Sequence, residues 1–255
     1  MTFTGFIGTV CMFPLRAIIA ASVALRIHPN TLTLIGVLIN VGAAWALGRD
    51  HFVLAGVIMI VANIFDFIDG KVAHITNTQS EFGAFWDSTL DRFSDIALFI
   101  GLIYLYSDLR RTDYVLVAAL GMMFSIMTSY ARARAESLIE KCKVGFMERP
   151  ERIVLFMIGA FTDRMAAVLW VILILSIVTV ANRIHYTYLA LNNKPVPRGS
   201  NALTQVFWRA FFWTDERTTI PYDLWVAAIL AFTWLTPPDW IRDPTAAGFG
   251  LWSWW

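Results

Sequence analysis

Long apolar stretches, separated by short polar turns, recur along most of the chain. After residue 28 they lie at residues 31–47, 52–72, 83–106, 114–135, 149–161 and, following a turn at 162–164, up to about residue 183. Most of them have about 20 residues, the length that a helix needs to cross a bilayer. The pattern therefore predicts an all-α integral membrane protein with a six-helix transmembrane core.

The segment before this core is apolar but interrupted by charge. Arg16 lies in the middle of residues 3–26, which favours an amphipathic helix at the membrane interface. His28-Pro29-Asn30-Thr31 then predicts a helix start, with Asn30 or Thr31 as the N-cap. We therefore expect residues 1–27 to form an N-terminal interfacial helix.

The segment after the core changes in character. Residues 192–200 contain two prolines and a glycine, which predict a linker. Residues 221–236 are apolar but only marginally long enough to span, and residues 239–255 contain four tryptophans, which suit the headgroup region. We expect residues 28–190 to be the transmembrane domain and residues 191–255 to be a linker with an apolar, Trp-rich, membrane-associated extension.

The composition supports this class. Hydrophobic residues make up 58% of the 255 residues and charged residues only 15%, against about 25% charged residues in soluble domains. The two cysteines, Cys11 and Cys142, are far apart in sequence and do not suggest a disulfide framework. The charges that do occur in or beside apolar stretches therefore become the candidates for function.

Four carboxylates gather around one predicted turn. Asp66 and Asp69 lie near the end of one apolar stretch, and Asp87 and Asp91 lie near the start of the next. Their spacings of three and four residues put each pair on one helix face. Gly70 and the polar residues that follow allow a turn, so a hairpin would bring all four together. Acidic groups at membrane depth are costly and usually functional.

Four clustered anions require neutralisation in a low dielectric. A pair of divalent cations with oxygen ligands is the natural counter-charge, and two metals suit phosphoryl transfer because they hold the attacking and leaving oxygens in line. Two alternatives are a solvated acidic helix-loop-helix and a cation transporter. A transporter would spread its acids along a pathway, whereas these crowd one end of two adjacent stretches.

The acidic segment also resembles a known family. The pattern D-x2-D-G-x2-A-R-x8-G-x3-D-x3-D is typical of the CDP-alcohol phosphotransferases. This chain has the required residues at every spacing except one: Asp66, Asp69, Gly70, Ala73, Gly83, Asp87 and Asp91. His74 stands where the family has arginine. The run from Pro29 to Thr33 also resembles the family's P-N-x-L-T motif at the start of its first span.

The resemblance implies the transfer of a lipid-linked phosphoryl group from CDP-diacylglycerol or CDP-archaeol to a small hydroxyl acceptor, with release of CMP. It implies two Mg²⁺ or Mn²⁺ ions bound by the aspartates, with Asp91 also acting as the general base. It further implies a homodimer among membrane lipids and no nucleic-acid partner. The residues implied for the metals are Asp66, Asp69, Asp87 and Asp91, and those implied for the nucleotide are Asp69, Gly70, Ala73, His74, Gly83 and Asp87.

His74 leaves an alternative open. Histidine is mostly neutral at neutral pH, whereas arginine is always charged. If the family arginine serves the nucleotide diphosphate, His74 gives a weaker contact that Lys71 could compensate. A catalytically silent member of the family is the other interpretation, and a helix-end histidine without a substrate role is the simplest one.

A basic segment at residues 129–152 resembles one subgroup. The run Ser129 to Glu136 and the run Glu148 to Arg152 resemble the phosphatidylinositol phosphate synthases and their archaeal ether-lipid relatives. The resemblance implies inositol 1-phosphate as the acceptor, with glycerol 3-phosphate as the alternative. Its phosphate would be held by Arg132, Arg134, Arg149 and Arg152. For Lys141 and Lys143 a contact with anionic lipids is equally reasonable.

Spacing and charge add two expectations. Arg132 and Arg134 are two residues apart on one helix, so their directions diverge by about 200°, whereas Arg149 and Arg152 can share a face. Residues 131–152 carry six lysines or arginines, so the positive-inside rule places this loop and the acidic cluster on the cytoplasmic side. We expect the membrane to be the plasma membrane of a prokaryote.

Overall fold

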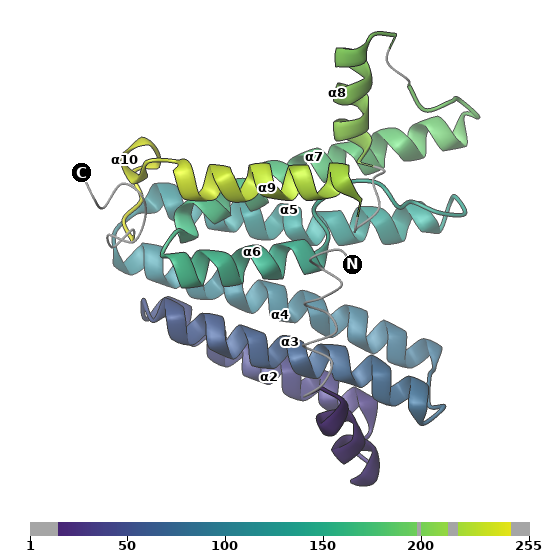
Figure 1. Cartoon of the computed structure of the whole chain (residues 1–255), viewed down its shortest axis with the longest axis vertical. Coiled ribbons are helices and arrows are strands. Elements are labelled where there is room, and N and C mark those ends of the chain that lie inside the picture. The colour runs from purple at the N-terminus through teal and green to yellow at the C-terminus, as the bar shows by residue number, and fades with distance from the viewer. Residues whose placement is uncertain (1–14, 198–199, 214–218, 246–255) are drawn as a thin grey trace. The chain divides into compact units, whose positions relative to one another are not determined.

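The computed structural model describes residues 15–197, 200–213 and 219–245, and this part of the chain is helical with no β-strand. The chain divides into two compact units, Met1–Leu105 and Tyr106–Trp255. Each unit contains its own cluster of buried apolar residues. Figure 1 labels the helices in chain order.

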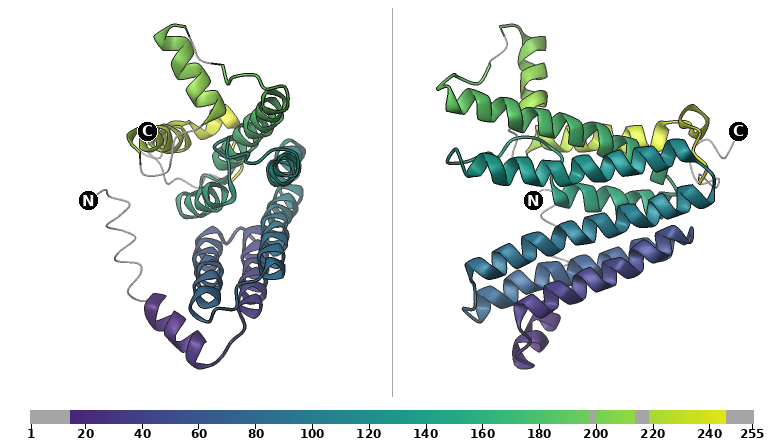
Figure 2. Two further views of the ribbon diagram at one scale, coloured as in Figure 1. Left: turned by 90° about the vertical axis from the view of Figure 1, so that its right-hand side faces the viewer. Right: turned by 180° about the vertical axis from the view of Figure 1, so that it is seen from behind.

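The first unit is a helical bundle. A short helix, Leu15–Ala24, precedes α2 (Pro29–Gly48), α3 (Phe52–Ile75) and α4 (Glu81–Asp108). Helix α4 extends a few residues past the boundary of the unit. Figure 2 shows α2, α3 and α4 running side by side. This hairpin of α3 and α4 carries the four aspartates, as the sequence predicts.

The start of α2 differs from the prediction. The N-cap is His28, whose ring nitrogen Nδ1 accepts the backbone N–H of Asn30 at 3.2 Å. Asn30 and Thr31 were the expected caps, but both lie inside the helix because Pro29 already occupies its first turn. Proline suits that position since it has no N–H to satisfy and its φ is preset.

Small residues allow the helices of the first unit to approach closely. A side chain at Gly36 of α2 would meet the Ala62 carbonyl oxygen of α3 at 3.2 Å. At Gly101 of α4, a Cβ would collide with the backbone carbonyl group of Ala44 in α2. Helices in membranes are held largely by such close packing, because lipid offers no hydrophobic driving force.

The second unit is organised around one long helix. It contains α5 (Thr112–Glu136), α6 (Arg149–Thr162), α7 (Met165–Leu191), α8 (Ala202–Phe212), α9 (Ile220–Leu235) and the short α10 (Pro238–Ile241). Helix α7 contacts α5, α6, α8 and α9, and the run from Met165 to Leu169 at its start is fully buried. In Figure 1, α5, α6, α7 and α9 run side by side while α8 projects away from them.

Within the described residues, four helices are long and apolar enough to cross a membrane: α2, α3, α5 and α7. The protein is therefore an integral membrane protein. Helix α4 has 28 residues but carries the acids in its first half, and α6 has only 14 residues, fewer than the roughly 17–25 that a simple span needs.

Most helix bounds agree with the predictions to within about three residues. The exception is α7, which continues to Leu191 although we expected it to end near residue 183. Arg183 does not end the helix because its guanidinium is buried and bonded to protein oxygens.

The expected terminal segments are described only in part. The predicted N-terminal helix is seen from Leu15 to Ala24, and residues 192–197 are not helical, as expected of a linker. Helix α9 coincides with the predicted apolar segment at residues 221–236. Residues 1–14 and three of the four C-terminal tryptophans, Trp252, Trp254 and Trp255, lie outside the described residues.

We predict that Gly101→Ala destabilises the first unit. Its methyl group would collide with the α2 backbone at Ala44, and overpacking of this kind costs about 1–3 kcal/mol. Gly42→Ala in α2 is the matched control, because nothing lies within 4 Å of its added Cβ and alanine favours helix. Thermal unfolding in detergent, followed by circular dichroism, should show a lower midpoint for Gly101→Ala only.

Candidate functional site

Three of the four predicted carboxylates converge in the first unit. Asp66 of α3 and Asp87 and Asp91 of α4 each offer an oxygen, and these oxygens all lie within 4.8 Å of one another. All three side chains are half-buried. The convergence follows from the helical spacing of Asp87 and Asp91 and from the turn that folds α4 back against α3. The hairpin therefore makes a concentrated negative site.

Asp69 lies beside this group but is oriented differently. It is buried, with 6% of its surface exposed. Its Oδ2 accepts a hydrogen bond from the Thr33 hydroxyl of α2 at 2.5 Å, and its Oδ1 accepts the Gly70 N–H at 2.5 Å. It still lies near enough to Asp87 and Asp66 to interact with their charges. Asp69 thus borders the three-carboxylate group and links it to α2.

A pocket of about 220 Å³ opens next to the carboxylates. It brings together five of the six predicted nucleotide residues, from both helices of the hairpin. These five are Asp69, Gly70, Ala73, Gly83 and Asp87. The start of α2 and the turn between α3 and α4 supply the rest of its wall, including Asn30 and Ser80. The predicted nucleotide residues therefore share one cavity in this structure.

The two glycines of the pocket have different surroundings. A Cβ at Gly70 would meet nothing within 4 Å, whereas a Cβ at Gly83 would lie 3.2 Å from the Ser80 hydroxyl and 3.5 Å from Asn30 Oδ1. Gly70 therefore leaves open space, and Gly83 allows the turn and the start of α2 to lie close to α4.

His74 does not line this pocket. It lies in an adjoining hollow with Lys71, Phe67 and Gln79, and Gly70 contributes to both hollows. Lys71 and His74 are exposed. The structure therefore places the one departure from the family pattern beside a lysine, in a hollow that shares Gly70 and Gln79 with the pocket.

The donor set of the acidic site fits a hard divalent cation. Carboxylate oxygens are the preferred ligands of Mg²⁺ and Mn²⁺, and three half-buried carboxylates this close together repel one another unless a cation or protons neutralise them. Asp66, Asp87 and Asp91 could thus hold a metal, and Asp69 lies close enough to join them.

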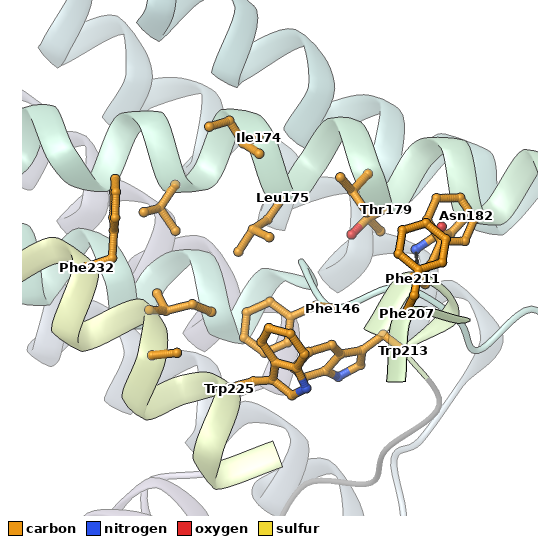
Figure 3. Close-up of a pocket in the computed structure, with 14 residues that line it drawn as sticks. Phe146, Ile174, Leu175, Thr179, Asn182, Phe207, Phe211, Trp213, Trp225 and Phe232 are labelled. Atoms are coloured by element: carbon orange, nitrogen blue, oxygen red, sulfur yellow. Dashed lines mark hydrogen bonds between the residues drawn. The ribbon is translucent and has the colours of Figure 1, made fainter. Parts of the chain in front are cut away.

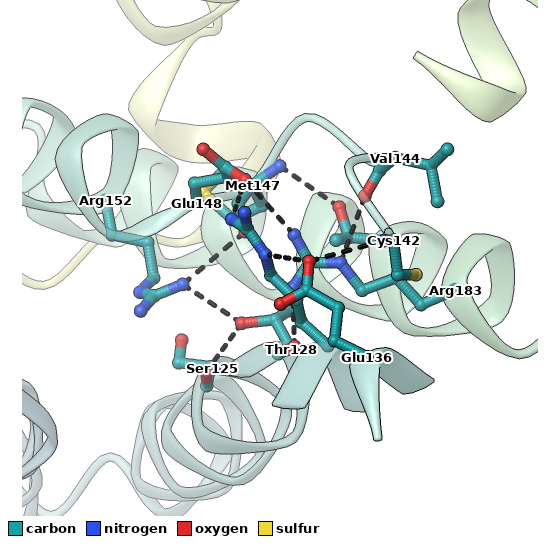
Figure 4. A network of polar contacts seen from close by, with 11 residues as sticks. Ser125, Thr128, Glu136, Cys142, Val144, Met147, Glu148, Arg152 and Arg183 are labelled. Carbon is teal, nitrogen blue, oxygen red and sulfur yellow. Dashed lines mark hydrogen bonds and ion pairs between the residues drawn. The ribbon is translucent and has the colours of Figure 1, made fainter. Parts of the chain in front are cut away.

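Two of the four predicted acceptor residues enter a polar network in the second unit (Figure 4). At its centre Glu148 accepts from Arg132 at 2.8 Å and from Arg183 at 3.5 Å. Arg132 also pairs with Glu136 at 3.1 Å. Arg152 is 2% exposed, and it donates to the Thr128 hydroxyl at 3.1 Å. The network connects α5, the loop before α6, α6 and α7.

The other two predicted arginines are placed differently. Arg134 is exposed and donates to the Ser137 hydroxyl at 3.2 Å, within its own helix end. Its partner therefore differs from those of Arg132, which are Glu136 and Glu148. Arg149 is half-buried at the first position of α6.

Sequence reasoning missed several residues of these sites. Thr33 was recognised only as part of a helix-start motif, and its bond to Asp69, which is 36 residues away, has no local signal. The sequence marked residue 183 only as the expected end of a helix, yet Arg183 is 3% exposed and donates to the Val144 carbonyl at 3.0 Å and to that of Thr128. Its position in a long apolar stretch was the available signal, because such charges are usually functional or paired.

Comparison with known proteins gives consistent matches. The family model described as CDP-alcohol phosphatidyltransferase matches residues 26–188. An archaetidylinositol phosphate synthase from Pyrococcus horikoshii is 35% identical over 173 residues, which cover 68% of this chain and 89% of that protein. A phosphatidylinositol phosphate synthase from Mycobacteroides abscessus is 33% identical over 166 residues, covering 62% and 76%.

Solved structures share the fold. The crystal structure of Mycobacterium tuberculosis phosphatidylinositol phosphate synthase with CDP-DAG bound matches with a TM-score of 0.66 at 24% identity, covering 73% of this chain and 98% of that chain. The same enzyme in complex with manganese and citrate also matches with a TM-score of 0.66. At this identity the likeness shows the fold alone.

We predict that the purified protein binds Mn²⁺ without substrates and that Asp87→Asn weakens the binding. Removing one of three adjacent carboxylates should lower affinity by more than about tenfold, since even residues outside the ligand shell contribute about 10–100-fold. Asp108→Asn, at the exposed far end of the same helix, should bind as the parent does. Titration followed by electron paramagnetic resonance of free Mn²⁺ measures both, and equal affinities would contradict the assignment.

Proposed function

Because this chain belongs to the CDP-alcohol phosphatidyltransferase family, we propose that it moves a phosphatidyl or archaetidyl group from a CDP-linked lipid to a hydroxyl of inositol 1-phosphate and releases CMP. The observation that carries the proposal is the convergence of Asp66, Asp87 and Asp91 beside a pocket lined by the residues of the nucleotide pattern. The relatives' names support the inositol phosphate acceptor.

In this proposal Asp66, Asp69, Asp87 and Asp91 hold two divalent cations, Mg²⁺ or Mn²⁺. When bound, the ions supply positive charge for the diphosphate and for the leaving CMP. Thr33 keeps the Asp69 carboxylate in place through its hydroxyl. A transition state that carries more charge than the ground state gains most from such fixed groups.

Asp91 is the proposed general base. It takes the proton of the acceptor hydroxyl, whose oxygen forms a bond to the lipid-linked phosphorus while the bond from that phosphorus to the CMP oxygen breaks. General-base catalysis needs a basic group within hydrogen-bond reach of the proton. Asp91 is suited to this role because it is half-buried and belongs to the three-carboxylate group, four residues beyond the pocket residue Asp87.

The nucleotide occupies the pocket beside Asp69 in this proposal, with the open space at Gly70 facing it. Asn30 and Ser80 contribute polar groups from the opposite wall. Lys71 compensates for the arginine that the family has in place of His74, because Lys71 and His74 share the adjoining hollow. The silent-member alternative predicts no CMP release with any acceptor.

We propose that the acceptor phosphate is held by Arg132, Arg134, Arg149 and Arg152. Arg132 and Arg152 already belong to one network with Arg183. The three guanidinium groups of this network outnumber its two carboxylates, which are those of Glu136 and Glu148. An anion would be attracted to this excess of charge, and arginine forks match phosphate geometry.

The membrane arrangement is also a proposal. We propose that α4 and α6 join the four apolar helices to form a six-helix domain over residues 28–190, with residues 1–27 at the interface and residues 191–255 as an extension. Six lysines or arginines in residues 131–152 support a cytoplasmic active site in a prokaryotic plasma membrane. A homodimer rests on the family resemblance.

We predict that Asp91→Asn lowers kcat by about 10²–10⁴-fold, the range typical of a lost general base. The isosteric amide keeps the shape of the site, so CMP binding should change little. Steady-state CMP release and equilibrium CMP binding in the presence of Mn²⁺ measure the two effects. Parent-like turnover would show that another group takes the proton, whereas lost CMP binding would assign Asp91 mainly to the metals.

We predict that Arg132→Gln raises the KM for inositol 1-phosphate and leaves the KM for the CDP-lipid nearly unchanged. Losing one charge-assisted contact costs about 1.5–3 kcal/mol, equivalent to about 10- to 150-fold. Lys141→Gln, an exposed charge of the loop that follows α5, is the control. Kinetics with each substrate varied in turn measure the effect. If the parent uses free inositol or glycerol 3-phosphate equally well, the acceptor assignment is wrong.

A further inference from the structure

An apolar cavity lies in the second unit, and none of the residues that line it has been given a role above. It has a volume of about 490 Å³ and is lined by fourteen residues, which come from α7, α8 and α9 together with Phe146 and Trp213 (Figure 3). Along α7 it extends from Val171 to Asn182, which is about 16 Å of helix. The volume lies within the range of about 300–1,000 Å³ that is typical of small-molecule sites.

Two of the cavity's walls lie outside the family domain. The family match ends at residue 188, whereas α8 and α9 follow residue 200. Both are fixed to the rest of the unit. The Phe212 carbonyl at the end of α8 accepts the Gly145 N–H at 3.1 Å, and the Tyr222 hydroxyl of α9 donates to Glu151 at 3.1 Å. The C-terminal extension therefore builds this cavity.

The lining of the cavity is almost entirely apolar, which disfavours water inside it. Apart from the indole N–H groups of Trp213 and Trp225, only Thr179 and Asn182 contribute polar side-chain atoms. The Thr179 hydroxyl already accepts the Met147 N–H at 3.1 Å. Apolar cavities stay empty of water unless polar partners are present. Because α7 is a candidate membrane span, the medium that surrounds such a cavity is lipid.

One polar group at the end of the cavity lacks a partner. Asn182 is 1% exposed and lines the cavity, and its amide nitrogen donates to the Phe211 carbonyl. Its Oδ1 is buried and accepts no hydrogen bond from the described residues. A buried acceptor left in this state has lost its hydrogen bonds to water without replacement, which destabilises the fold. A ligand that donates a hydrogen bond at this end would remove this destabilisation.

From these observations we propose that the cavity binds a single hydrocarbon chain with a hydroxyl group at one end, as in a long-chain alcohol or a monoacyl lipid. The hydroxyl donates to Asn182 Oδ1, at the end of the cavity nearest Arg183. The chain runs along α7 toward Val171, between the aromatic residues of α8 and the apolar face of α9. This site is separate from the proposed sites for the nucleotide and for the acceptor phosphate.

The test uses hexadecan-1-ol with a diazirine in the middle of its chain, added to the full-length protein in detergent. After irradiation, peptide mass spectrometry should place the label on α7 between residues 171 and 182 and on α9. Ala228→Trp fills the cavity and should lose this label. Ala227 is the neighbouring residue and does not line the cavity, so Ala227→Trp should keep the label. Equal labelling of both variants would overturn the proposal.

A second pair of variants distinguishes a filled cavity from a variant that has lost its label because it misfolds. Leu175→Trp also fills the cavity, and Ile177→Trp adds the same ring to α7 outside the cavity. Label must be lost in Leu175→Trp and kept in Ile177→Trp, with thermal unfolding midpoints measured for all four proteins. Unlabelled hexadecan-1-ol should compete about 2- to 12-fold better than its methyl ether, which cannot donate. Equal competition would overturn the role of Asn182.

Discussion

Mutual repulsion of carboxylates in a membrane protein is the constraint on which the first unit depends. Three carboxylate oxygens within 4.8 Å of one another cannot all remain ionised in a poorly polarisable environment without a counter-charge. The fold nevertheless holds them together. Close helix packing at Gly36 and Gly101 fixes the backbones, and the Thr33 hydroxyl supports Asp69. Such a site is arranged in advance for a strongly charged ligand and pays for this in stability.

The second unit solves the opposite problem, since it must bury positive charge. Arg152 and Arg183 are almost completely buried, and a lone buried guanidinium would be very costly. Carbonyl and hydroxyl oxygens from α5 and the loop before α6 surround them, and Glu148 supplies a countercharge. The network therefore fixes the loop that precedes α6. This also explains why α7 continues past Arg183 to Leu191.

Local spacing determined most of what could be predicted. The three- and four-residue intervals of the aspartates indicated one hairpin and one cluster, and the structure brings Asp66, Asp87 and Asp91 together. The direction of Asp69 could not be predicted, because it depends on a hydroxyl from a different helix. The same applies to the partners of Arg183, which are 35 to 55 residues away. The α9 segment could be recognised by its apolarity, but the cavity that it forms with α7 and α8 could not be predicted, because it depends on which helix faces meet.

Gly70 and Gly83 show how one pocket can place different demands on two residues of the same type. A larger residue at Gly83 would press on the turn and on α2, so folding itself disfavours change there. At Gly70 an added side chain would meet empty space. A larger residue there would therefore change the stability of the fold little, but it would clash with a ligand in the pocket. A substitution at Gly70 would therefore impair ligand binding without impairing stability, whereas one at Gly83 would impair stability. A variant with alanine at position 70 would have a smaller pocket, and it would favour a smaller ligand over the one that the parent protein binds.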